Sequence, residues 1–316
     1  MPIESTVKEL VAPITHPSAS ERRSTKIGRP RLLIVGCGDI GMRVLQRVHR
    51  SWQMLALTSN PARVHELRAA GARPLLGNLD LPQTLLRLAG LADAVLHLAP
   101  PAATGAEDRR TANLLRALAR GAPPKCIVYA STTGVYGDCG GARFDESRLT
   151  APGTDRARRR VDAEQRVRRF GAEFGVRATI LRIPGIYASD RAGGHPRERL
   201  LRGSPVLRRE DDVFTNHIHA DDLARACVRA LSRELSQRVV HVCDDSEMLM
   251  GDYFDLAADL CGMPRPQRLD RVQMRQLMSP MQFSFMSESR RLINTRLKTE
   301  LGLRLHYGQV ADGLLA

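Results

Sequence analysis

The segment Arg31–Arg50, RLLIVGCGDIGMRVLQRVHR, places an apolar run directly before a glycine-rich turn and an amphipathic helix. Such a run is typical of a strand buried in a parallel sheet. Gly36 permits a tight turn, Gly38 has no side chain to block a diphosphate, and Gly41 lets the helix lie close to the strand. Because the helix N-terminus presents free N–H groups, the segment predicts a dinucleotide-binding βαβ unit. The alternative is a glycine-rich turn in an unrelated α/β fold.

The residues after the second apolar run distinguish between the two nicotinamide dinucleotides. Met54–Thr58 ends about 20 residues after the glycine turn, where an NAD site usually has an Asp or Glu for the ribose hydroxyls. This chain has TSNPAR there. Thr58 and Ser59 can donate hydrogen bonds and Arg63 offers a planar guanidinium to a 2′-phosphate, so the sequence favours NADP, with NAD as the alternative. In a competing interpretation, Thr58 and Ser59 cap the next helix and Arg63 is an ordinary surface arginine.

Apolar runs and helical patterns alternate through the first half of the chain. Further strands are expected at 73–80, 92–101 and 125–132, and helices at 81–90 and 107–121. A helix near 155–174 and a strand Arg177–Ile183 follow, and later segments comprise a short strand at 239–243 and helices near 251–262, 269–279 and 288–301. Strands separated by helices predict an α/β fold, a Rossmann doubly wound parallel sheet.

Composition and cysteine usage favour a cytoplasmic protein. The 316 residues are enough for one large domain or for a core with a smaller lobe. The six cysteines are scattered without a C-x-x-C pair, and we expect them to be reduced. The first 29 residues hold no apolar stretch of signal-peptide length, and no run approaches the ~18 apolar residues of a membrane span. We expect no membrane partner and, because no ligand cluster has metal spacing, no metal.

A net charge of +14 raises the question of a nucleic-acid partner. The positive charge is spread over both halves of the chain, and only 4% of the residues are aromatic, which leaves few platforms for base stacking. Only four of the 48 basic residues are lysines, which is typical of a codon bias toward GC. We therefore expect no nucleic-acid partner.

Seven motifs in order give the chain a family resemblance. They are GCGDIG, HLAPP, YASTTGVYGD, LRIPGIY, NHIHADDLA, VVHVCDD and LINTRLKTELGL. Together they resemble the extended short-chain dehydrogenase/reductase superfamily, the NAD(P)-dependent epimerase/dehydratase group that acts largely on nucleotide sugars. The GxGxxG spacing is more similar to the atypical branch. The resemblance covers roughly residues 31–313.

The resemblance also implies a domain organisation. We expect a flexible N-terminal tail at 1–29, an NAD(P)-binding Rossmann domain at 30–186 and a smaller C-terminal substrate lobe at 187–316. Segments near 215–245 are expected to return to the Rossmann core. Relatives often dimerise through long helices such as the one expected at 155–174, which makes a homodimer a candidate assembly.

The resemblance implies a catalytic arrangement that this chain lacks in part. Thr132 takes the place of the substrate-orienting hydroxyl, although a strand-end threonine can equally bond to the backbone. Aligned on Glu164, Arg156 stands where the family has its tyrosine and Arg160 where it has its lysine. No tyrosine lies between 136 and 187 and no lysine between 125 and 298, so the Tyr-x-x-x-Lys pair is absent.

Arginine cannot repeat the proton transfer of a tyrosine supported by a lysine. Its pKa lies above about 12, so it holds its protons. Arg160 could still bond to ribose hydroxyls, and Arg156 could bind an anionic group. In the alternative interpretation Arg156 is solvated and Arg160 pairs with Glu164 one helical turn away. We expect Arg158 and Arg159 to be solvated.

The remaining candidates line the expected cleft or its cofactor. Tyr187 occupies a family position at the substrate cleft, and Asn78 stands where many relatives place an Asp against the adenine. Arg43 is a further candidate phosphate contact, and Asp221 and Asp222 are expected to cap a helix. The expected cofactor-binding residues are Gly36, Gly38, Asp39, Ile40, Gly41, Thr58, Ser59, Arg63, Asn78, Leu79, His97 and Ala99.

Two functions follow from these residues. The first is an NAD(P)-dependent oxidoreductase or epimerase that acts on a hydroxylated or nucleotide-linked small molecule. The second is a catalytically silent NADP-binding protein with a structural or regulatory role, which the intact glycine turn and the missing Tyr-x-x-x-Lys pair would suit.

Overall fold

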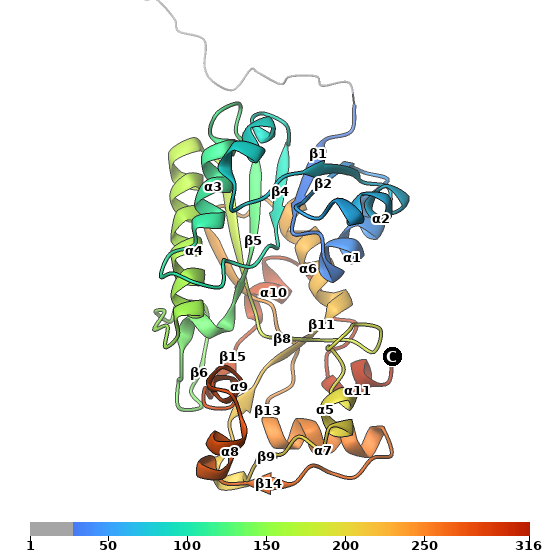
Figure 1. Cartoon of the computed structure of the whole chain (residues 1–316), viewed down its shortest axis with the longest axis vertical. Coiled ribbons are helices and arrows are strands. Elements are labelled where there is room, and N and C mark those ends of the chain that lie inside the picture. The colour runs from blue at the N-terminus through green and yellow to red at the C-terminus, as the bar shows by residue number, and fades with distance from the viewer. Residues whose placement is uncertain (1–27) are drawn as a thin grey trace, which may run out of the picture.

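A central sheet of seven parallel strands organises the chain. The computed structural model describes residues 28–316, apart from the side chains of 280, 281 and 285, so most of the expected tail at 1–29 lies outside the described residues. The strand order is β12-β7-β5-β4-β1-β2-β3, and each neighbouring pair is parallel. The strands are β1 (Arg31–Val35), β2 (Gln53–Thr58), β3 (Arg73–Leu76), β4 (Ala94–His97), β5 (Cys126–Thr132), β7 (Arg177–Ile183) and β12 (Arg238–His241). The predicted doubly wound sheet is confirmed (Figure 1).

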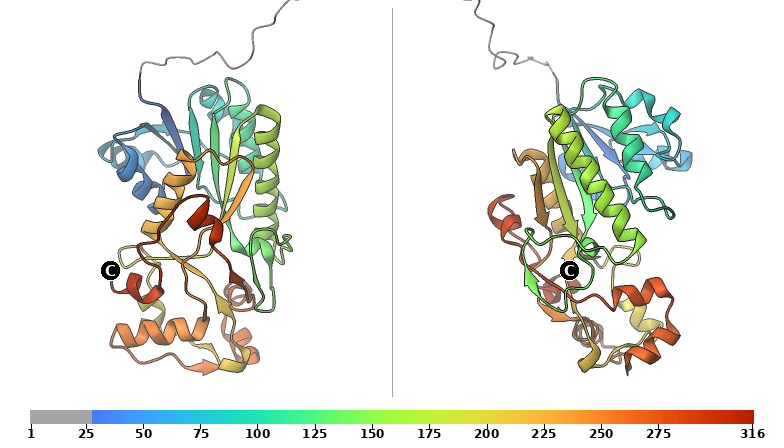
Figure 2. Two further views of the ribbon diagram at one scale, coloured as in Figure 1. Left: turned by 180° about the vertical axis from the view of Figure 1, so that it is seen from behind. Right: turned by 90° about the vertical axis from the view of Figure 1, so that its left-hand side faces the viewer.

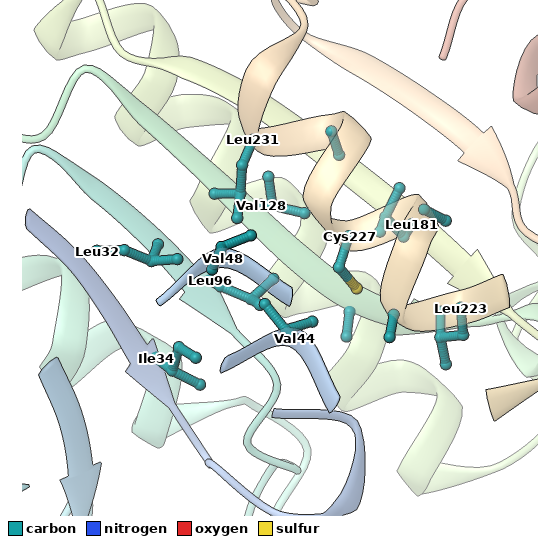
Figure 3. Packing of buried hydrophobic residues seen from close by; sticks show 14 of the residues in the cluster. Leu32, Ile34, Val44, Val48, Leu96, Val128, Leu181, Leu223, Cys227 and Leu231 are labelled. Carbon is teal, nitrogen blue, oxygen red and sulfur yellow. The ribbon is translucent and has the colours of Figure 1, made fainter. Parts of the chain in front are cut away.

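Helices cover both faces of this sheet because alternate strand residues point to opposite faces. In β1, Leu32 and Ile34 pack with the face that carries α1 (Asp39–Val48) and α6 (Ala220–Ser232) (Figure 3). Leu33 and Val35 pack with the opposite face. That face carries η2 (Pro82–Leu88), α3 (Arg109–Leu118) and α4 (Asp155–Phe174), while η1 (Pro61–Arg63) and α2 (Val64–Ala69) connect β2 to β3.

The second lobe lies beyond the carboxyl ends of the central strands (Figures 1 and 2). It contains short paired strands: β8 (Gly185–Tyr187) with β11 (His217–His219), β9 (Val206–Leu207) with β14 (Arg268–Leu269), and β10 (Phe214–Thr215) with β13 (Met248–Leu249). β6 (Arg143–Phe144) pairs with β15 (Arg291–Leu292), and η3 (Thr133–Tyr136) and η4 (Arg209–Asp211) are short turns of 3₁₀ helix. Its helices are α5 (Arg197–Leu201), α7 (Met250–Leu260), α8 (Arg271–Leu277), α9 (Pro280–Phe285) and α11 (Val310–Leu314). The helix α10 (Thr295–Thr299) packs against β12 of the central sheet instead.

The chain crosses back from the second lobe into the first. After β11, α6 packs against α1, and β12 then joins the edge of the central sheet beside β7. Leu223 and Cys227 of α6 enter the same buried cluster as Val44 of α1 (Figure 3). The Rossmann sheet is therefore completed by a late segment of the chain. No helix of the described residues is long and apolar enough to cross a membrane.

Two expected helices differ from the observed structure. The prediction of a helix at 288–301 is wrong for its first half, because the N–H groups of Arg291 and Ile293 bond to the carbonyls of Ala142 and Phe144 and form β15. Only α10 is helical there. At 81–90 the helix is the 3₁₀ helix η2, in whose first turn the Thr84 hydroxyl bonds to neighbouring backbone.

Candidate active site

A groove made of three adjoining hollows follows the carboxyl edge of the central sheet. The turn hollow, about 290 Å³, lies at the glycine turn, and the ribose hollow, about 460 Å³, lies beside the ends of β2 and β3. The lobe hollow, about 540 Å³, opens toward the second lobe. The turn and ribose hollows share Gly36, Gly38 and Leu98 in their walls, and the turn and lobe hollows share Thr132 and Pro184. This edge is where ligands bind in doubly wound sheets.

The three glycines of the turn differ in what surrounds them. Gly36 has φ +83°, and a Cβ there would lie 2.5 Å from the backbone nitrogen of Ala99. A Cβ on Gly41 would lie 3.1 Å from the Cys37 sulfur, so this glycine permits close packing of α1 on the sheet. A Cβ on Gly38 would meet no heavy atom of the described chain within 4 Å beyond its neighbours. Gly38 therefore faces the open turn hollow, which Asp39, Ile40 and Gly41 also line.

The ribose hollow gathers the residues expected at the adenosine end. Its wall includes Thr58, Ser59, Arg63, Asn78, Leu79 and Ala99, and its lining holds no carboxylate among the described residues. Arg63 donates to the Cys37 carbonyl at 2.6 Å and forms two hydrogen bonds with Glu66, at 2.9 and 2.8 Å. The helical turn η1 is capped by Asn60, whose side chain accepts from Ala62, so the interpretation of Thr58 and Ser59 as the cap is wrong.

Arg110 and Asn78 complete the wall of the ribose hollow. Arg110, which the sequence did not single out, also lines the ribose hollow and pairs with Asp80 through bonds of 2.8 and 2.6 Å. Asn78 lines it too, and its side-chain oxygen accepts from the Asp80 N–H at 2.9 Å. Arg110 could have been found from its position in the first turn of α3, the helix that follows β4.

His97 lies beneath the groove. Its side chain is buried outside the linings of the three hollows, and Nε2 forms a 2.8 Å hydrogen bond with the Thr111 hydroxyl. Its ring packs against Tyr129 at 5.1 Å. Burial lowers the pKa of His97 to about 3, and the nearby Arg160 acts in the same direction. His97, which was expected to bind the cofactor, therefore packs in the interior, outside the three hollows.

We predict that three buried histidines make the fold sensitive to acid. Burial lowers the pKa values of His97 and His217 to about 3 and of His241 to about 4. Because these values lie below the unfolded value near 6.5, the stability is present above pH 6.5 and is lost as the pH falls toward 4. Each histidine contributes up to about 1.4 kcal/mol per pH unit. Buried Asp244, whose pKa is raised, opposes part of this slope.

The measurement is the free energy of unfolding in urea at several pH values between 7 and about 4.5. His97→Gln should reduce the slope by about one proton, or about 1.4 kcal/mol per pH unit. His49→Gln, which alters an exposed histidine on the surface, is the control and should keep the wild-type slope. Equal slopes for wild type and His97→Gln would contradict the prediction.

Thr132 lies where the turn hollow meets the lobe hollow. It ends β5, and its hydroxyl oxygen accepts from the N–H of Gly134 at 3.3 Å, which caps η3. The backbone role and the exposure to both hollows coexist. The hydroxyl is held at the strand end while remaining at the groove.

The helix α4 places two arginines on the groove. Thr154 caps this helix by accepting from the N–H of Ala157 at 3.2 Å. One turn apart, Arg156 lines the lobe hollow and Arg160 lines the turn hollow. Arg160 donates to the Ala130 carbonyl at 2.7 Å and to the Tyr129 hydroxyl at 3.0 Å. Burial and the neighbouring Arg160 guanidinium lower the pKa of Arg156.

Two expectations for the same helix are corrected. Arg158 is exposed and pairs with Asp155, but Arg159 is buried and donates to the Gly105 carbonyl at 2.6 Å, so the prediction that it is solvated is wrong. Arg160 does not pair with Glu164, because Glu164 points into the interior and Arg182 of β7 binds it there.

A buried polar network lies beneath Thr132. Glu164 accepts two hydrogen bonds from Arg182, at 3.1 and 2.7 Å, and one from Ser131 at 2.5 Å. Arg182 also donates to the Tyr136 hydroxyl at 2.6 Å, which in turn bonds to His241. The network joins α4, β5, β7, η3 and β12 at the end of the sheet that bears the groove.

Three other expected residues lie outside the linings of the three hollows. Tyr187 is buried and lines a fourth hollow of about 290 Å³, which shares Gly185, Thr215 and Met250 with the lobe hollow. Its hydroxyl has no hydrogen-bond partner among the described residues. The cap of α6 is the ring of His219, which accepts from the N–H of Asp221. The expectation that Asp221 and Asp222 are the caps is therefore wrong.

Asp221 and Asp222 bind other partners. Asp221 accepts from Arg43 and Arg47, at 2.8 and 2.9 Å. Asp222 is buried and accepts from the N–H groups of His306 and Tyr307, so it holds the segment that leads to the C-terminus. Arg43 also pairs with Asp39 and Asp190. Its guanidinium, which was expected to contact a phosphate, therefore binds carboxylates in this structure.

Comparison with known proteins agrees with the motifs and the fold. Residues 32–243 match the model of the NAD dependent epimerase/dehydratase family. The chain belongs to this family. A conserved protein of unknown function from Silicibacter pomeroyi DSS shares 30% identity with it over 90% of this chain and 96% of that one, with a TM-score of 0.76. No curated protein matches.

Two enzymes of known activity have the same fold as this family member. A UDP-glucose 4-epimerase from Thermotoga maritima, solved with UDP-glucose, is 20% identical over 90% of this chain and 96% of its own, with a TM-score of 0.74. A dTDP-glucose 4,6-dehydratase double mutant from Streptomyces venezuelae, solved with NAD, is 21% identical over 90% and 94%, with a TM-score of 0.72.

Proposed function

We propose that the chain binds NADP(H) along the groove and transfers hydride between it and a hydroxylated or nucleotide-linked small molecule in the lobe hollow. The observation that carries the proposal is the continuity of the three hollows, with Thr132 between the turn hollow and the lobe hollow. Membership of an NAD dependent family supports the cofactor class.

The residues of the groove fit a dinucleotide. Gly38 faces open space at the start of α1, where backbone N–H groups and the helix dipole favour phosphate. Thr58, Ser59 and Arg63 would hold a 2′-phosphate in a hollow whose described lining has two arginines and no carboxylate. Both arginines pair with carboxylates outside this lining, Arg63 with Glu66 and Arg110 with Asp80. The support for NADP over NAD is that no carboxylate of the described residues lines the hollow to repel a 2′-phosphate.

When bound, the nicotinamide supplies or accepts the hydride. Thr132 would orient the substrate oxygen, since its hydroxyl is fixed at the end of β5. Arg156 would stabilise negative charge on that oxygen, because its guanidinium lines the same hollow. Neither Arg156 nor Arg160 gives up a proton near neutral pH, so water, Thr132 or the substrate itself would serve the proton step.

The decisive experiment is a fluorescence titration of the protein with NADPH and with NADH, followed by a screen of nucleotide sugars and small carbonyl compounds for NADPH oxidation. We expect tighter binding of NADPH and turnover of at least one compound. Binding without turnover across the screen would replace the enzyme proposal with a silent NADP-binding role. Binding of neither dinucleotide would overturn both.

We predict that Arg63→Ala removes the preference for NADPH. The variant lacks the charge-assisted contact between the guanidinium and the 2′-phosphate, so the Kd for NADPH should rise roughly 10- to 100-fold. The Kd for NADH should change by less than about threefold, a difference within 1 kcal/mol. Arg68→Ala, at an exposed position in the last turn of α2, is the matched control. An equal loss for both dinucleotides would contradict a 2′-phosphate contact.

A further inference from the structure

A segment of the second lobe reaches back to the glycine turn. Residues 188–196 connect β8 to α5, and two of their side chains bind α1. Asp190 accepts from Arg43 at 2.5 Å, and the Nε of Arg191 donates to Asp39 at 3.1 Å. Asp39 is the first residue of α1, so this segment lies against the helix start that would face a diphosphate.

The attachment is reinforced from the Rossmann lobe. Arg43 binds Asp221 of α6 at 2.8 Å as well as Asp190, and its side chain is only 11% exposed. Burial alone would lower the pKa of Arg43, but the surrounding carboxylates raise it above its usual range. The pairing fixes the backbone next to Arg191, which positions that guanidinium at the turn.

Arg191 lines the groove, and Asp39 accepts from only one of its side-chain nitrogens, Nε. It lines the turn hollow together with Gly38 and Ile40. Apart from the bond from Nε to Asp39, its terminal nitrogens have no hydrogen-bond partner among the described residues. The other arginine in this lining, Arg160, already donates to Ala130 and Tyr129.

The turn hollow also contains an acidic residue, whose charge must be offset if a diphosphate binds there. The carboxylate of Asp39 lines the same hollow and would repel a diphosphate. Arg191 offsets this charge by pairing with Asp39, and its planar guanidinium can bind a phosphate at the same time. The helix N-terminus supplies only partial charge to the same place.

We propose that Arg191 contacts the diphosphate of the bound dinucleotide, so that the second lobe contributes directly to the cofactor site. The proposal depends on the proposed binding of NADP(H). It implies that the cofactor binds both lobes, with Arg63 at its 2′-phosphate and Arg191 at its diphosphate.

The test compares two ligands by titration calorimetry: NADPH, and adenosine 2′-monophosphate, which has the 2′-phosphate but no diphosphate. Arg191→Ala should raise the Kd for NADPH about 10-fold, because one charge-assisted contact is lost. The Kd for the monophosphate should change by no more than about twofold. Arg191→Lys keeps the positive charge but not the planar guanidinium, so its Kd for NADPH should lie between those of the wild type and Arg191→Ala. Arg197→Ala, at an exposed position on α5, is the control for altering an arginine of this region.

Arg191→Ala could also weaken NADPH binding indirectly, by leaving the negative charge of Asp39 unpaired. A second comparison in the Asp39→Asn protein separates this effect from a direct contact. If Arg191 contacts the diphosphate, Arg191→Ala should weaken NADPH in the Asp39→Asn protein too. No effect in that background would overturn the contact, as would equal weakening of NADPH and the monophosphate. If the wild-type protein binds no dinucleotide, the proposed function fails first, before the variants are compared.

Discussion

Replacing Glu164 with alanine is expected to lower the free energy of unfolding by about 3–5 kcal/mol, because it leaves a buried arginine without its carboxylate. Arg182 is 5% exposed and loses both of its hydrogen bonds to Glu164, and Ser131 loses its acceptor. Equilibrium unfolding in urea, followed by circular dichroism, measures the change.

A matched control lies on the same helix. Glu173→Ala alters an exposed glutamate near the end of α4 and should change stability by no more than about 0.5 kcal/mol. The double variant Glu164→Leu with Arg182→Met removes both charges and should be more stable than Glu164→Ala alone. A Glu164→Ala protein as stable as the control would contradict the assignment of this pair as a buried ion pair.

The second large effect is expected from Gly38→Val, which should weaken NADPH binding at least about 100-fold while leaving the thermal unfolding midpoint unchanged. Gly38 has φ −83° and ψ −152°, an extended conformation outside the positive-φ region that favours glycine. An added Cβ would meet no heavy atom of the described chain within 4 Å beyond its neighbours, whereas the side chain would occupy the proposed place of the diphosphate. Fluorescence titration and thermal unfolding measure the two properties separately.

Gly36→Ala should behave in the opposite way. Its positive φ and the 2.5 Å approach of a Cβ to the Ala99 nitrogen should destabilise the fold itself. The two glycines therefore separate a ligand effect from a folding effect. Undiminished NADPH binding by Gly38→Val would contradict the placement of the diphosphate at this turn.

Local sequence determines much of the sheet and of the groove. In β1 every residue is apolar except the first, and alternate side chains enter the two core clusters on opposite faces of the sheet. A parallel strand covered on both faces buries all of these side chains. The glycine turn follows directly from it. Arg156 and Arg160 could be placed on one face of α4 because residues four apart lie one turn apart.

Partners that are distant in the chain could not be assigned in the same way. Glu164 has several arginines nearby in sequence, yet its partner is Arg182, from a neighbouring strand. Arg159 is buried because the loop before α3 passes over it and its Gly105 carbonyl accepts a hydrogen bond. Arg191 lies in an irregular segment without periodicity, so its position beside α1 depends on tertiary contacts alone.

The late return of α6 and β12 to the first lobe has a consequence for how the protein is made. A ribosome that has released only the first 186 residues has produced six strands of the sheet, with β7 exposed as an unpaired edge. The apolar face around Leu32 and Leu181 also lacks the helix that covers it (Figure 3). An isolated N-terminal half should therefore aggregate, and the shortest soluble fragment should extend at least through β12.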